Sequence, residues 1–156
     1  MKKFGRLDIF VNNAAEQHET KEPLEIPAKQ LERTFRTNVF GYFFMTKAAL
    51  RHMKKGAVIL STTSITAYIG NKTLINYAST RGAIVAFTRS LSEALVGKGI
   101  RVNGVAPGPI CTPLIPSSYS AKKLLSTAPV HRCNEPANLM KLPHAMFSLL
   151  QMMRHI

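Results

Sequence analysis

Three short apolar runs separated by two long helical patterns constrain the fold of this chain more than any other feature. The apolar runs cover residues 7–11, a stretch that begins with residues 57–60, and residues 100–108. Hydrophobic residues recur every three or four positions over residues 28–54 and 74–96, which predicts a helix in each. The order strand, helix, strand, helix, strand is typical of a parallel sheet with crossover helices. The sequence therefore predicts an α/β fold.

The last third of the chain gives weaker signals. A proline-rich loop follows residue 108, and helical patterns occur near residues 121–126 and over residues 139–153, the second of them rich in methionine. We therefore expect residues 1–127 to form one α/β domain and residues 128–156 to form a divergent tail that could be helical.

The chain is strongly basic, with 21 Lys and Arg against 8 Asp and Glu and a formal net charge of +13. Such a charge raises the question of an acidic partner, including a nucleic acid. The basic residues are scattered along the predicted helices and loops, without a compact cluster or an interleaved aromatic platform. Non-specific nucleic-acid binding is therefore a minor alternative.

Cysteine and histidine positions favour reduced thiols and no metal site. Cys111 and Cys133 are too few to stabilise a fold of this size by disulfides, and the histidines lack the spacing of metal ligands. The basic N-terminus has no continuous apolar core, and the longest uncharged run, residues 102–121, contains four prolines. We expect a cytoplasmic protein with neither a signal peptide nor a membrane-spanning helix.

One tyrosine has the surroundings that proton transfer requires. Tyr77 and Arg81 lie four positions apart near the start of the second predicted helix, so their side chains share one face. A phenol ordinarily has a pKa of about 10, and it exchanges a proton near neutral pH only beside a positive charge. Ser64 lies at the end of the preceding strand, where its hydroxyl could bond a substrate oxygen.

Five motifs follow one another in a fixed order. They are VNNAA at residues 11–15, TNVFG around Asn38, the STTS that ends at Ser64, YASTR at residues 77–81, and APGPICTPL at residues 106–114. Together they resemble the short-chain dehydrogenase/reductase family, and the similarity runs from about residue 4 to residue 116. NNAAEQH and SITAYIGNKTLINY further resemble a bacterial subgroup of glucose-dehydrogenase-like and general-stress oxidoreductases.

The resemblance implies a role for each matching residue. Tyr77 would be the general acid and base, Ser64 would orient the substrate oxygen, and Arg81 would assist Tyr77. Asn38 would support a proton-relay water by distorting its helix. Nicotinamide-cofactor contacts would come from the following residues: Asn12, Ala14, Tyr77, Arg81, Pro107, Gly108, Ile110 and Thr112. The implied chemistry is hydride transfer between NAD(P) and an alcohol or carbonyl carbon.

The chain departs from the family pattern in three places. Arg81 stands where the family has lysine, and its larger planar fork is expected to lower the rate by about tenfold to a thousandfold. The glycine-rich TGxxxGxG turn, which holds the cofactor phosphates, has no counterpart in this sequence. The family's final strand is not recognisable after about residue 138.

These departures predict a partial, Rossmann-like doubly wound parallel sheet that lacks its first half. Residues 1–127 would form the nicotinamide and catalytic half, truncated at both ends of the chain. The strand at residues 7–11 would have an unpaired edge and an uncovered apolar face. We therefore expect marginal stability, weak NADP or NAD binding, and a tendency to aggregate or pair with another chain.

Two function classes follow from this sequence besides the minor nucleic-acid alternative. The first is an NAD(P)-dependent oxidoreductase acting on a small alcohol, carbonyl or sugar substrate, as a homo-oligomer or with a related chain of the family. The second is an inactive remnant whose two long helices serve as an oligomerisation or interaction module. The missing glycine-rich turn and Arg81 leave enzymatic activity undecided at this point.

Overall fold

The computed structural model describes residues 4–108 together with Leu114 and Ser118. The helical patterns expected near residues 121–126 and 139–153, and the domain boundary expected at residue 127, lie outside the described residues. Within the described residues, none of the helices combines the length and the apolar character that crossing a membrane requires.

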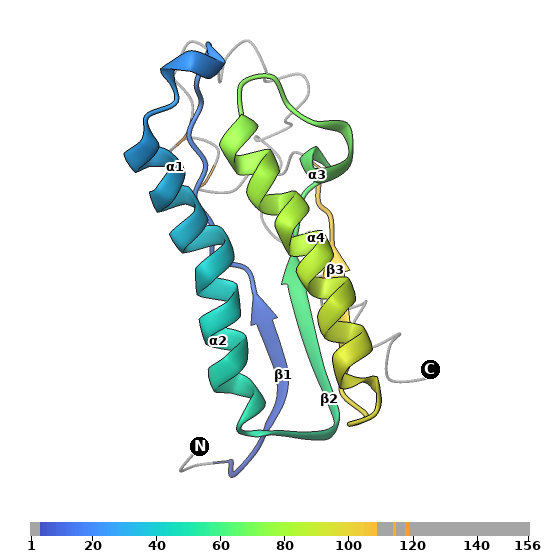
Figure 1. Cartoon of the computed structure of the whole chain (residues 1–156). Coiled ribbons are helices and arrows are strands. Elements are labelled where there is room, and N and C mark those ends of the chain that lie inside the picture. The colour runs from blue at the N-terminus through green and yellow to red at the C-terminus, as the bar shows by residue number, and fades with distance from the viewer. Residues whose placement is uncertain (1–3, 109–113, 115–117, 119–156) are drawn as a thin grey trace, which may run out of the picture. The chain divides into compact units, whose positions relative to one another are not determined.

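Three parallel strands form the sheet, in the order β1-β2-β3 (Figure 1). They are β1 (Leu7–Asn12), β2 (Met53–Thr62) and β3 (Arg101–Val105). Both strand connections are crossovers that contain helices, as the alternating sequence pattern predicts. The predicted α/β class and its parallel sheet are confirmed.

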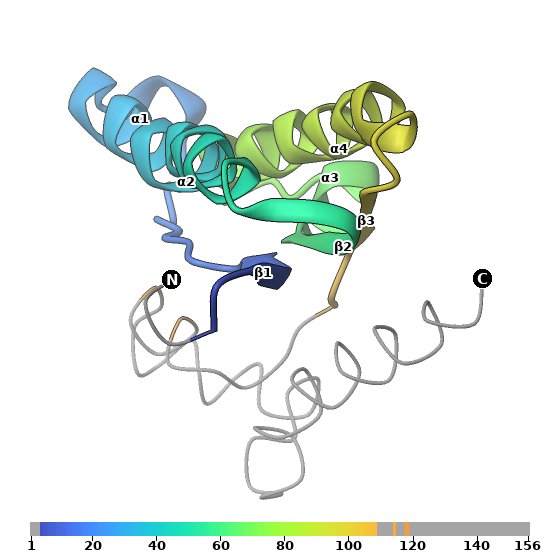
Figure 2. The same ribbon diagram turned by 90° about the horizontal axis from the view of Figure 1, so that it is seen from below.

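The helices α1, α2 and α4 all cover the same face of the sheet (Figure 2). The first crossover holds a short 3-10 helix (Pro23–Glu25), α1 (Ala28–Phe35), a π-helical turn (Arg36–Phe40) and α2 (Gly41–Leu50). The second crossover holds the short α3 (Thr66–Ile69) and the long α4 (Ile75–Val96).

The hydrophobic core lies between this sheet face and the helices α2 and α4. Its buried members come from α2, β2, α4, β3 and the residue just before β3: Ala49, Met53, Ala57, Ile59, Leu95, Ile100 and Val102. Phe10 of β1 and Leu91 of α4 pack against this cluster. The apolar positions that predict strands and helices in the sequence are therefore also the positions that join the layers.

The expected helix over residues 28–54 is interrupted once and ends early. The π-helical turn separates α1 from α2, and α2 ends at Leu50. Met53 then starts β2 and pairs with Leu7, while the Leu7 N–H donates to the His52 carbonyl at 3.1 Å. Met53 is buried in the core as a strand residue, which is why its apolar side chain extends the helical pattern in the sequence.

The sequence pattern predicts that Gly56 ends that helix, and this prediction is wrong. Gly56 lies inside β2 with a φ of 89°, a conformation that favours glycine, and its N–H donates to the Gly99 carbonyl at 2.8 Å. The irregular register between β1 and β2 falls in the same region, between the Leu7 and Ile9 pairs. Gly56 therefore allows β2 to bend where its register with β1 is irregular.

Candidate active site

Polar side chains gather where β1 and β2 end and α4 begins. In a parallel sheet the carboxyl ends of neighbouring strands meet at one edge, where ligands commonly bind. The Thr62 hydroxyl at the end of β2 donates to the Asn13 side-chain oxygen, just past β1, at 2.9 Å. Tyr77 and Arg81 stand in the first two turns of α4 and are buried. The predicted catalytic residues, Ser64 just after β2 and Tyr77 and Arg81 on α4, therefore belong to segments that meet at this edge.

Arg81 extends into the protein interior, where only 2% of the residue is exposed. Its Nη1 donates to the Thr62 carbonyl at 2.7 Å and to the Tyr42 hydroxyl at 3.2 Å. The guanidinium carbon lies 4.8 Å from the centre of the Tyr77 ring. The cation thus lies over the face of the phenol ring, where it is attracted by the ring's negative face.

The charge of Arg81 is balanced by dipoles rather than by a carboxylate. Among the described residues, Arg81 forms no ion pair, and its Nε has no hydrogen-bond partner. Burial raises the pKa of Tyr42 above its ordinary value, and the nearby Arg81 charge opposes this increase. Arg81 and Tyr42 therefore lie in a part of the interior where burying a charged group costs free energy.

Ser64 and Tyr77 retain hydroxyl groups that can serve a substrate. The Ser64 Oγ accepts hydrogen bonds from the Thr66 N–H at 3.2 Å and from the Thr66 hydroxyl at 3.0 Å, which leaves its own proton to donate. The Tyr77 hydroxyl forms no hydrogen bond within the described part of the chain, and the residue is largely buried. Among the described residues, neither hydroxyl proton has an acceptor, so both groups can donate to a ligand oxygen.

Asn38 ties three segments together through its side chain. Its Nδ2 donates to the Glu16 carbonyl at 2.9 Å and to the Thr80 hydroxyl at 3.0 Å, and its Oδ1 accepts from the Glu16 N–H at 2.9 Å. The Thr80 hydroxyl donates in turn to the Tyr77 carbonyl at 2.7 Å. Asn38 lies in the π-helical turn, so the helix is distorted at this residue. Its support of a proton-relay water stays a prediction.

The residues expected to contact the cofactor differ in burial and in whether their side chains already form hydrogen bonds. Asn12 uses its Nδ2 to donate to the Thr46 hydroxyl at 2.9 Å, so its side chain is engaged inside the protein, whereas Ala14 is exposed. Pro107, which is half-buried, and the exposed Gly108 belong to a second unit that starts at Pro107. The expected contacts Ile110 and Thr112 lie outside the described residues. Cofactor binding by these residues stays a prediction.

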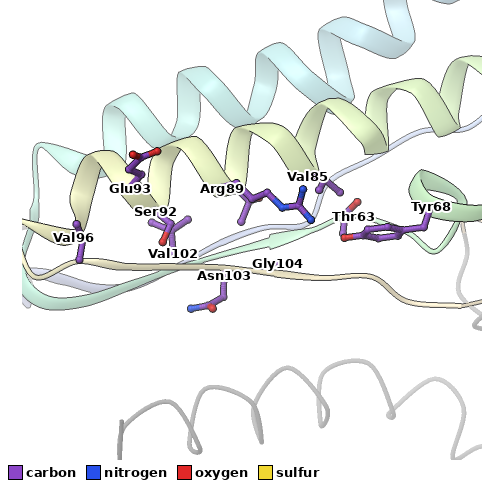
Figure 3. Close-up of a pocket in the computed structure, with 11 residues that line it drawn as sticks. Thr63, Tyr68, Val85, Arg89, Ser92, Glu93, Val96, Val102, Asn103 and Gly104 are labelled. Carbon is purple, nitrogen blue, oxygen red and sulfur yellow. The ribbon is translucent and has the colours of Figure 1, made fainter.

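An open pocket of about 570 Å³ lies between α4 and β3 (Figure 3). Thr63 is its member nearest in sequence to the catalytic positions, and Arg89, Glu93 and Asn103 line it further along. None of the predicted site residues that the structure describes lines it, although Thr63 precedes Ser64 and its hydroxyl donates to the Arg81 carbonyl at 2.9 Å. No group of three metal-ligating side chains occurs among residues 4–108, Leu114 and Ser118.

Comparison with known proteins connects this geometry to one family. Residues 1–150 match the family described as Enoyl-(Acyl carrier protein) reductase. The structure also resembles a solved short-chain dehydrogenase/reductase, a glucose/ribitol dehydrogenase from Brucella melitensis, with a TM-score of 0.69 and 36% identity. That similarity covers 82% of this chain and 49% of the other. The chain belongs to the short-chain dehydrogenase/reductase family.

Sequence relatives support the same assignment and the narrower resemblance. NADPH-dependent aldehyde reductase 1, chloroplastic, of Arabidopsis thaliana is 56% identical over 136 residues, which are 85% of this chain and 47% of the relative. General stress protein 39 of Bacillus subtilis is 55% identical over 119 residues, 76% of this chain and 42% of the relative. The chain thus spans about half the length of the curated short-chain dehydrogenase/reductase relatives it matches. Neither an interaction module nor nucleic-acid binding gains support here.

Sequence reasoning missed several partners of the predicted residues in this short-chain dehydrogenase/reductase. Tyr42 counts among the apolar positions of the first helical pattern, although its hydroxyl bonds Arg81. The backbone carbonyl of Thr62 leaves no trace in a sequence, and Thr80 is hidden inside the YASTR motif. The available signal was the helical spacing of Thr80 beside Tyr77, which places both on one side of α4.

Proposed function

We propose that this chain supplies the catalytic half of an NAD(P)-dependent oxidoreductase that interconverts alcohols and carbonyl compounds. One observation carries the proposal: the Tyr77 ring lies against the Arg81 guanidinium, 4.8 Å from ring centre to guanidinium carbon, and its hydroxyl has no hydrogen-bond partner among the described residues. Ser64, two residues after the end of β2, holds a second hydroxyl whose proton has no acceptor among the described residues. Such a pair suits proton transfer to and from a substrate oxygen.

Each residue has a distinct task in this mechanism. The bound nicotinamide would donate or accept the hydride. Ser64 would donate a hydrogen bond to the substrate oxygen and hold it in place. Tyr77 would give its hydroxyl proton to that oxygen during reduction and take it back during oxidation. Asn38 would keep the α4 turn that carries Tyr77 fixed through its bond to Thr80.

The hydroxyls of Ser64 and Tyr77 suit hydrogen bonding to a substrate oxygen that is oxidised or reduced by a nicotinamide cofactor. We propose NADP or NAD as the cofactor, bound weakly by this chain alone; the Arabidopsis relative is named for NADPH. The substrate would be a small alcohol, carbonyl compound or sugar, because the groups offered to it are hydroxyls rather than charged side chains.

A surface on α2 and on the last residue of the π-helical turn before it suits association with a second copy or with a related chain. It consists of large apolar side chains of which about half or more is exposed: Phe40, Phe43, Phe44 and Met45. Phe43 also stacks on Phe87 of α4 with ring centres 4.3 Å apart. Because α2 and α4 lie side by side on the same face of the sheet (Figure 2), both helices could contribute to a homo-oligomer interface.

The test is turnover and cofactor binding by the Tyr77→Phe and Ser64→Ala variants. NADPH or NADH consumption is followed with aldehydes and sugars, and cofactor affinity by calorimetric titration. We expect kcat to fall by about a hundredfold to ten-thousandfold in Tyr77→Phe, the range of a lost acid and base group. The exposed Tyr68→Phe serves as a control and should keep its activity. Unchanged turnover in Tyr77→Phe would refute the proposed role.

A further inference from the structure

The geometry points to Tyr42 as a positioning residue of this site, one that holds the Arg81 guanidinium over the Tyr77 ring; its effect on catalysis rests on the proposed function. Tyr42 is 2% exposed and lies in α2, outside every motif singled out in the sequence. Its hydroxyl donates to the Thr62 carbonyl at 3.1 Å and accepts from Arg81 Nη1 at 3.2 Å.

Two acceptors fix the orientation of the guanidinium. One is the Thr62 carbonyl, 2.7 Å from Nη1, which belongs to the backbone of β2 and stays in place whatever the side chains do. The other is the Tyr42 hydroxyl, which is itself held by the same carbonyl. Arg81, Tyr42 and Thr62 thus form a closed triangle of three hydrogen bonds that joins α4, α2 and β2.

The Arg81 guanidinium depends on this support because, among the described residues, it donates no other hydrogen bond. Among the described residues it has no carboxylate partner, and its Nε is buried without an acceptor. A guanidinium is a planar group whose orientation depends on paired acceptors, whereas a lysine ammonium is a compact charge. Without the Tyr42 hydroxyl, Nη1 keeps a single fixed acceptor and the plane can turn away from Tyr77.

A purely structural role for Tyr42 predicts a different outcome from a positioning role. The Tyr42→Phe variant keeps the buried ring and removes only the hydroxyl, so packing is preserved. Tyr68→Phe is the matched control, because it removes the hydroxyl of an exposed tyrosine. A structural role would change stability alone, whereas a positioning role changes the motion of the Arg81 guanidinium.

NMR of the arginine side chains in the full chain tests this proposal without any need for activity. In the unmodified chain we expect slowly exchanging Arg81 Nη protons that are shifted by the Tyr77 ring current, and Tyr77→Leu should remove the shift. In Tyr42→Phe we expect the slow exchange to disappear while circular dichroism shows a folded chain. Slow, ring-shifted signals that persist in Tyr42→Phe would overturn the proposal. Arg81 Nη signals averaged by fast rotation in the unmodified chain would overturn the proposal, even if the Tyr42→Phe variant failed to fold.

Kinetics then separate this inference from the proposed function. We expect Tyr42→Phe to lower kcat about tenfold with little change in KM, since a displaced supporting group impairs the reacting geometry. When Arg81→Lys is already present, adding Tyr42→Phe should lower kcat less than about twofold, because the guanidinium that Tyr42 positions is no longer there. A chain without any turnover would refute the proposed function, and the NMR result would still decide the role of Tyr42.

Discussion

At the residue scale, Arg81 combines features that oppose each other. A buried cation without a carboxylate partner is costly, and replacing it with an apolar residue is often tolerated. Three dipolar contacts offset part of this cost here, namely the Thr62 carbonyl, the Tyr42 hydroxyl and the face of the Tyr77 ring. Such an arrangement is explained more readily by chemistry at the site than by stability.

Tyr42 makes the stability of the chain sensitive to alkaline pH. Burial raises the pKa of Tyr42 in the folded state, so the folded chain holds this proton more tightly than the unfolded chain does. The contribution is fully present below about pH 10, the ordinary pKa of tyrosine, and is lost as pH rises through the folded value. We therefore expect the free energy of unfolding to decrease above about pH 10, and less steeply in Tyr42→Phe.

Urea denaturation followed by circular dichroism at several alkaline pH values measures this dependence. Tyr68→Phe should show the same slope as the unmodified chain, because Tyr68 is exposed. If the free energy of unfolding fell equally steeply with pH in Tyr42→Phe and in the unmodified chain, the loss of stability at alkaline pH would come from other groups.

At the scale of single elements, Gly56 provides a test of the bend in β2. Its φ of 89° is unfavourable for any residue with a side chain, although a Cβ added at this position would meet no atom within 4 Å. We expect Gly56→Ala to destabilise the chain by about 1–2 kcal/mol, which is the cost of left-handed backbone. Chemical denaturation measures this change.

Gly97 offers the matched control. It follows α4 with a φ of −64°, and a Cβ there would likewise meet no atom within 4 Å. Gly97→Ala should therefore leave stability unchanged or raise it by about 0.4–1 kcal/mol. Equal effects at the two glycines would show that the backbone conformation at Gly56 does not matter.

The sequence predicts the elements well and their boundaries less well. β1 and α4 differ from expectation by a single residue at one end, because apolar periodicity and the glycines after α4 mark them clearly. The end of α2 is missed because Met53 is apolar and satisfies a helical pattern, while its pairing with Leu7 depends on a residue far away in the sequence. Neither the π-helical turn nor α3 has a signal in the sequence that periodicity can detect.

Site prediction has the same limit. Motifs identify Ser64, Tyr77 and Arg81 because those residue types suggest chemistry. They do not tell whether Arg81 points toward a ligand or into the interior, because that depends on the Tyr42 hydroxyl and on a backbone carbonyl of another element.

At the scale of the whole molecule, the exposed phenylalanines of α2 predict self-association. Phe44 is 68% exposed on α2, which covers the same face of the sheet as α4 (Figure 2). We expect Phe44→Glu to lower the average mass in solution, since a charge at an apolar interface is expensive to bury. Light scattering coupled to size exclusion measures the mass.

The exposed Lys47, on the same helix, provides the control for this surface. Lys47→Ala should keep the parent mass, and circular dichroism should show that both variants are folded. A Phe44→Glu chain with the parent mass would place any interface elsewhere.

Several hydrogen bonds of the candidate site span long stretches of chain, and they determine when the site can form. The bond between Thr62 and Asn13 joins residues 49 positions apart, that between Asn38 and Thr80 joins residues 42 apart, and that between Arg81 and Tyr42 joins residues 39 apart. Closing such loops costs entropy before any contact repays it, so distant contacts form late in folding. The reactive geometry therefore does not exist in a nascent or partly folded chain, and the hydroxyls of the site come together only once both crossovers have docked.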